Sequence, residues 1–115
     1  AMTRSTAILL SALAMVSLQP AMAACEYPGE ITIPSGASAT EAEMKAANQA
    51  VKQYMAAVES YLACLDEEEK ALGDTVTEEQ KKVHTQRHNA AVDALIAVAG
   101  RYNEQLQIYK KKNAP

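Results

Sequence analysis

Apolar residues repeat with a helical period along the middle of the chain. One line recurs every seven positions, at Met44, Val51, Val58, Leu65 and Leu72. A second set widens the line into one face, at Ala47, Tyr54, Met55, Tyr61 and Leu62. Such a face is the pattern of an amphipathic helix. Thr40 with Glu43 predicts a capping box at its start and Gly73 predicts its end, so we expect a helix over 40–73.

A second helix is predicted over 77–112, after a turn at 73–76. Its inward stripe consists of Val83, Ala91, Leu95, Val98, Tyr102, Leu106 and Tyr109, broadened by Val92 and Ile96. Thr77 with Gln80 forms another capping-box pattern, and Lys110, Lys111 and Lys112 suit the negative end of the helix dipole. Two long helices joined by a short turn predict an antiparallel hairpin, in which facing residue numbers sum to about 149.

An acidic run, 66–69, lies near the C-terminal end of the first helix, where the helix dipole disfavours negative charge. The facing positions in the hairpin include Lys81 and Lys82. We therefore expect these two lysines to offset the acidic run across the seam between the helices, with the run itself being a solvated face.

Residues 24–39 show no helical period and contain two prolines and several glycine or serine positions. Only the stretch Ile31 to Ile33 resembles a strand, and nothing is available to pair with it. We expect an extended arm that folds back along the first helix and lays Ile31 and Ile33 across the hairpin as a third layer. An arm of this length reaches far enough to bring Cys25 to Cys64.

The N-terminal 23 residues have the pattern of an export signal. Arg4 precedes a short uncharged apolar stretch, 7–16, and Ala21 and Ala23 place small residues where a signal peptidase requires them. The apolar stretch is too short to span a bilayer. We expect cleavage after Ala23, a periplasmic or secreted location, and no stable membrane anchor.

The two cysteines decide between two forms of the exported chain. Met22 and the alanines before Cys25 partly match a lipoprotein signal, and acylation of Cys25 would give an outer-membrane lipoprotein. Acylation would however leave Cys64 as a free thiol in an oxidising compartment. Cysteine parity therefore favours a Cys25–Cys64 disulfide. The predicted fold is all-α: a long antiparallel helical hairpin (40–115) with an N-terminal extended arm stapled to its first helix.

Composition limits the partners. The formal charge is −3, which disfavours nucleic acid as a partner. The chain has no Trp and no Phe, so its core is thin for one small domain. Four tyrosines broaden the apolar faces beyond one seam: Tyr54, Tyr61, Tyr102 and Tyr109. We expect them to contact a second copy or another helical protein.

His84 and His88 stand four residues apart, a spacing that stacks two imidazoles on one helix face. With Cys25 and Cys64 nearby, a zinc site with these four ligands can be drawn. The alternative is a pair of histidines on an exposed flank, with the thiols oxidised to each other. We expect no cofactor. No phosphate loop, nucleophile motif or His-Glu-x-x-His motif is present, which favours a protein that is not an enzyme.

Two resemblances bear on location and role. Cys25, Pro28, "ITIPSGASAT", "EAEM" and "YLACL" resemble small secreted proteobacterial proteins, which implies export but no activity. Val76 to Gln80 is similar to the Leu-Thr-x-x-Gln motif of the Spy and CpxP periplasmic chaperones, which implies an apolar concave surface with a basic rim. Three hypotheses follow: a helical interaction module that binds protein partners, a Spy-like envelope stress chaperone, and a periplasmic metal binder through His84 and His88.

Overall fold

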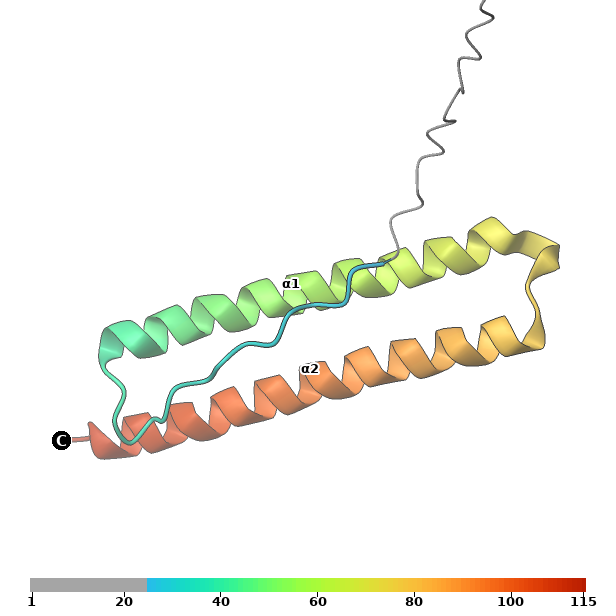
Figure 1. Cartoon of the computed structure of the whole chain (residues 1–115). Helices are drawn as coiled ribbons and strands as arrows, with labels where there is room; N and C mark the ends of the chain where they lie inside the picture. The colour runs from blue at the N-terminus through green and yellow to red at the C-terminus, as the bar shows by residue number, and fades with distance from the viewer. Residues whose placement is uncertain (1–24) are drawn as a thin grey trace, which may run out of the picture.

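The structure, a computed structural model, describes residues 25–115 and consists of two long antiparallel helices with an extended arm along them (Figure 1). Helix α1 spans Glu41–Leu72, a short 3-10 turn η1 spans Gly73–Thr75, and helix α2 spans Glu78–Lys112. Residues 25–115 contain no strand. The expected signal peptide over 1–23 lies outside the described residues.

The helix ends follow the capping chemistry of the sequence. Thr40 Oγ1 accepts a hydrogen bond from the backbone N–H of Glu43 (3.1 Å), but the Glu43 side chain does not return the bond, so only half of the expected capping box forms. At α2 the box is complete: Thr77 Oγ1 accepts from the Gln80 backbone N–H (3.1 Å), and Thr77 N–H donates to Gln80 Oε1 (2.9 Å). Gly73 ends α1 with φ +52°, a conformation that glycine adopts without a Cβ clash.

The core lies along one stripe of α1 and takes little from α2. The buried residues of α1 are Met44, Ala47, Val51, Tyr54, Val58, Tyr61 and Leu65. In α2 only Ala91 and Val98 are buried. The seven-residue repeat therefore predicted the buried line of α1 as far as Leu65, whose side chain is fully enclosed. Ile31 and Ile33 of the arm pack against this cluster as the expected third layer.

The C-terminal end of the arm lies beside the C-terminal part of α2. Residues 35–39 form a turn in which the backbone N–H groups of Ser38 and Ala39 donate to the carbonyl of Ser35. Gly36 is buried against Gln105, and its N–H donates to Gln105 Oε1 (2.8 Å). A Cβ at Gly36 would lie 2.0 Å from the Gln105 carbonyl oxygen, so only glycine permits this approach.

From Gly36 the arm runs back along the hairpin toward the turn (Figure 1) and ends at a disulfide between Cys25 and Cys64 of α1. The two Cα atoms are 5.6 Å apart, within the usual range for a bridge. This confirms the expected all-α hairpin with a stapled arm. Neither of the two described helices has an apolar stretch long enough to cross a membrane.

Candidate functional site

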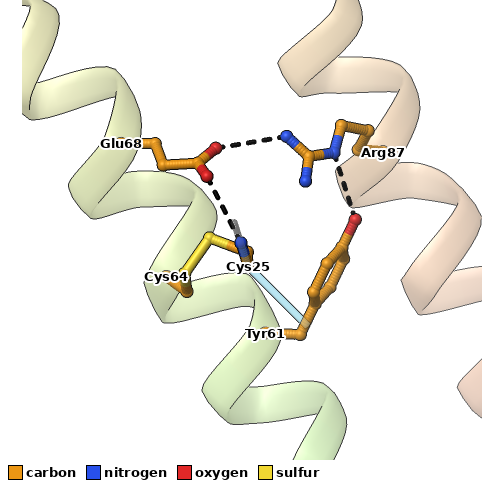
Figure 2. Close-up of a disulfide and its surroundings, with 5 residues drawn as sticks. All are labelled: Cys25, Tyr61, Cys64, Glu68 and Arg87. Atoms are coloured by element: carbon orange, nitrogen blue, oxygen red, sulfur yellow. Dashed lines mark hydrogen bonds and ion pairs between the residues drawn. A yellow bond between two sulfur atoms is a disulfide. The ribbon is translucent and has the colours of Figure 1, made fainter. Parts of the chain in front are cut away.

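The disulfide is surrounded by a polar network that joins all three parts of the fold. Figure 2 shows Glu68, one helical turn after Cys64, reaching from α1 toward Arg87 of α2. Glu68 Oε1 accepts a hydrogen bond from the Cys25 backbone N–H (3.4 Å), and Glu68 Oε2 lies 3.1 Å from Arg87 Nη1. One carboxylate therefore connects the arm, α1 and α2 beside the covalent bond.

Tyr61 completes this network from below the disulfide (Figure 2). Arg87 Nε donates to Tyr61 Oη (3.2 Å), and the guanidinium carbon lies 5.7 Å from the centroid of the Tyr61 ring. Tyr27 of the arm meets the same ring edge-on, with centroids 5.2 Å apart. The hydrogen bond to Tyr61 raises the pKa of Arg87, and the charge of Glu68 raises it further, so the guanidinium stays cationic.

Beyond the disulfide, a hollow remains between the helices at their turn end. This turn-end groove encloses ≈ 260 Å³. Its apolar part consists of Leu65, Leu72, Val76 and Val83, and its polar part of Glu68, Glu69, Glu79, Gln80, His84 and Arg87. All of these side chains come from the two helices and the turn, because the described part of the arm stops at Cys25.

His84 lies at the edge of the turn-end groove, between two carboxylates of the facing helix. Its Nε2 atom is 3.4 Å from Asp66 Oδ1 and 3.3 Å from Glu69 Oε2, and the side chain is only 18% exposed. His88 lies one turn further along α2, with its ring nearly parallel to that of His84 and 6.4 Å away. The carboxylates that the sequence motif lacked are thus supplied to His84 by α1.

The zinc site drawn from four ligands does not form, because both cysteines are consumed by the disulfide. Within residues 25–115, the one group of three potential ligand atoms that converges is Cys25, Cys64 and Glu68. Two of those three atoms are disulfide sulfurs, which have no thiolate to offer a metal. His84 and His88 stay together on one face of α2, apart from that group.

The acidic run is offset by different partners from those expected. Lys81 pairs with Glu78 of its own helix (3.3 Å), and Lys82 forms no ion pair with a described residue. His84 and Arg87 face the run instead. Helical periodicity explains the difference: His84 and Arg87 lie three residues apart on the inner flank of α2, whereas Lys81 and Lys82 are exposed.

The four tyrosines proposed as partner contacts lie mostly inside the hairpin. Tyr54 and Tyr61 are buried in the core, and Tyr102 is half-buried against it. Tyr109 is also half-buried, near the point where Gly36 approaches α2. The large apolar side chains that are exposed include Met55 of α1 and Ile96 of α2, and the sequence pattern had assigned both to the broadened apolar faces.

No protein-family model matches the chain, and neither a curated protein nor a solved structure is significantly similar to it.

Proposed function

We propose that this chain is a non-enzymatic binding module of the periplasm or the secreted fraction, and that it holds an extended segment of a protein partner in its turn-end groove. Export is inferred from the signal-peptide pattern, and the disulfide agrees with an oxidising compartment. The groove's ionisable groups are largely paired with one another, Glu68 with Arg87 and Glu69 with His84. Ionisable groups that are paired with one another in this way favour a role in binding over a role in acid–base catalysis.

The observation that carries the proposal is the arm itself. Between Gly36 and Cys25 an extended stretch of chain lies along the two helices, with Ile31 and Ile33 packed on the core. The turn-end groove continues the same seam past Cys25, and Leu65 is one of the residues that line it. An extended peptide with alternating apolar side chains can therefore use beyond Cys25 the same mode of packing that the arm uses before it.

The charges around the groove indicate what flanks those apolar side chains. Three glutamates line it, Glu68, Glu69 and Glu79, against one arginine and one histidine. A segment that carries lysine or arginine between its apolar residues complements this excess of negative charge. We therefore expect preference for a basic apolar segment over an acidic one of the same apolar content.

The test uses two labelled synthetic peptides that alternate leucine with lysine or leucine with glutamate. Fluorescence anisotropy with the oxidised protein measures both. We expect the lysine peptide to bind at least about 10-fold more tightly, and this preference to shrink as salt is raised. Equal affinity for the two peptides, or no binding of the lysine peptide, would contradict the proposal.

A matched pair of variants locates the binding. Val83→Lys places a positive charge in the groove, and Ile96→Lys makes the same kind of change at a more exposed position of the same helix outside it. We expect Val83→Lys to weaken lysine-peptide binding at least about 10-fold, because it removes an apolar contact and repels the lysines of the peptide, and Ile96→Lys to leave it unchanged. If the two variants behave alike, the groove is not the binding site.

Metal binding is a second candidate because His84 Nε2 lies within 3.4 Å of carboxylates from two different turns of α1. Zinc titration of the oxidised protein, followed by calorimetry, tests it against His84→Ala. A sub-micromolar site that disappears in His84→Ala would establish this candidate, whereas the binding-module proposal predicts no tight site.

The Spy-like chaperone stays a hypothesis on the motif around Thr77. A Spy-like surface would have a basic rim, whereas glutamates predominate around the turn-end groove. Suppression of aggregation of an unfolded client at a chaperone-to-client ratio near one would support it.

A further inference from the structure

The outer face of α1 carries a charge pattern that is complementary to itself. Six charged residues form one stripe, Glu41, Lys45, Lys52, Glu59, Asp66 and Lys70. At 100° per residue, all six fall within about 60° of one another around the helix. Counted outward from the midpoint between Met55 and Ala56, every charge has an opposite charge at the same distance on the other side.

This stripe points away from the disulfide that holds the arm on α1. Asp66 follows Cys64 by two residues, so it points about 200° around α1 from the disulfide. All six charged side chains belong to exposed residues. At the middle of its length the stripe is flanked by Met55, which is 40% exposed, on one side and by the exposed residue Ala56 on the other, each about 20° outside the arc of the charges. Two exposed uncharged side chains therefore border the middle of the stripe.

We propose that a second copy of this chain docks antiparallel on this stripe, with a two-fold axis between Met55 and Ala56. By this symmetry the two Met55 side chains lie together on one side of the contact, and the two Ala56 side chains lie together on the other side. The charges meet in three kinds of pair, each present twice by symmetry: Lys52 with Glu59, Lys45 with Asp66, and Glu41 with Lys70. The paired stretch is about 44 Å long at 1.5 Å per residue.

The pattern selects this arrangement over its competitors. A parallel pair would place every charge against itself. An antiparallel pair shifted by one heptad would place either Lys52 against Lys52 or Glu59 against Glu59, and would keep only two opposite-charge contacts where the proposed register has six. The sequence of charges therefore favours the antiparallel orientation and this register.

Lys52 and Glu59 have no other evident role. Neither has a charged residue three or four positions away on α1, and neither forms an ion pair with any described residue. Glu41 and Lys45 already pair within α1 (3.2 Å), so in the dimer they would form a four-charge cluster with Asp66 and Lys70 of the second copy. None of the six stripe residues lines the turn-end groove, although Asp66 lies 3.4 Å from His84 Nε2 at its edge, and the inference does not depend on the proposed function.

Sedimentation velocity of the oxidised protein with reciprocal charge swaps tests the inference. We expect a wild-type dimer with a dissociation constant on the order of 10 μM, weakened about 10-fold or more at high salt. Lys52→Glu and Glu59→Lys, each alone, should weaken it at least about 10-fold because each places like charges opposite one another twice. The double variant restores complementarity and should return to within about 3-fold of wild type. An equimolar mixture of the two single variants should form heterodimers.

Two variants on α2 serve as controls for net charge. Lys82→Glu and Glu104→Lys repeat the same charge changes at exposed positions outside the stripe, and we expect them to leave dimerisation unchanged. Circular dichroism checks that helix content is retained in every variant. A monomer at all concentrations, a dimer that survives both single swaps, or a double variant that fails to recover would each overturn the inference.

Discussion

The closest approach between the arm and α2 gives the sharpest test of the fold. In Gly36→Ala the new Cβ would lie 2.0 Å from the carbonyl oxygen of Gln105 and 2.9 Å from the backbone nitrogen of Tyr109. Ordinary contact begins at 3.4 Å, so the arm must retreat by roughly 1.4 Å. The atoms it meets belong to the helix backbone and cannot turn aside. The strain therefore falls on the arm.

The expected loss follows from two contributions. Overpacking against a rigid neighbour costs about 1–3 kcal/mol. Retreat also breaks the hydrogen bond from Gly36 N–H to Gln105 Oε1, 2.8 Å long, which contributes about 1 kcal/mol. Alanine also lowers the conformational entropy of the unfolded chain, which stabilises the folded state by about 0.4–1 kcal/mol. We expect a net loss of about 1–3 kcal/mol, or a fall of the urea midpoint by about 0.7–2 M at a slope near 1.5 kcal/mol/M.

Two further variants isolate the cause. Gly29→Ala adds a methyl group in the same arm where nothing lies within 4 Å, so its midpoint should stay at the wild-type value or rise slightly. Gln105→Ala removes the hydrogen bond without adding a clash, so its loss should be about 1 kcal/mol. If Gly36→Ala and Gly29→Ala unfold at the same urea concentration, the arm does not lie on α2 at this point and the reasoning fails.

Three other outcomes can be measured on the same protein. Replacing Cys25 and Cys64 with serine removes the closure of a loop of 39 residues and should cost about 4 kcal/mol in urea unfolding; a loss under about 1 kcal/mol would show that the staple is not stabilising. Burial raises the pKa of the Tyr54 phenol, and Tyr27 raises it further. The contribution of the neutral Tyr54 phenol to stability is therefore complete below about pH 10 and is lost as the pH rises further. In an ultraviolet titration of the tyrosines, the component that ionises at the highest pH should be absent from Tyr54→Phe. A Cβ added at Gly100 of α2 would have no atom within 4 Å, so Gly100→Ala should stabilise the fold by about 0.5–1 kcal/mol and raise the thermal midpoint. A lower midpoint would contradict the open surroundings of Gly100 in this fold.

The helices and the disulfide could be predicted from the sequence because each depends on local or covalent rules. The seven-residue spacing that ends at Leu65 needs only helix geometry, and the capping box at Thr77 needs only two residues three positions apart. The disulfide needs parity and the reach of the arm. These rules involve few residues and tolerate small errors in position.

The polar contacts of the candidate site needed more than those rules. The facing sum of 149 puts His84 opposite Leu65, which is close to its actual neighbours Asp66 and Glu69. This sum gives the height of a residue along the hairpin but not its rotation around the helix, so it pointed to Lys81 and Lys82 for the acidic run and not to Arg87. A helical wheel of α2 would have found Arg87. The contact of Gly36 with α2 depends on the path of the arm in space, which no spacing in the sequence encodes.

The arm is held at its two ends and by side chains between them, and this has a consequence for its amide protons. From 26 to 34, no backbone N–H donates to another described residue; the backbone donors of the arm are Cys25 at one end and Gly36, Ser38 and Ala39 at the other. Unlike a strand in a sheet, such a segment has no ladder to slow hydrogen exchange. Its amides should exchange with solvent almost as fast as those of an unfolded chain, while the neighbouring amides of α1 are protected. Low protection in this segment would therefore be a sign of its bonding pattern, and not of disorder.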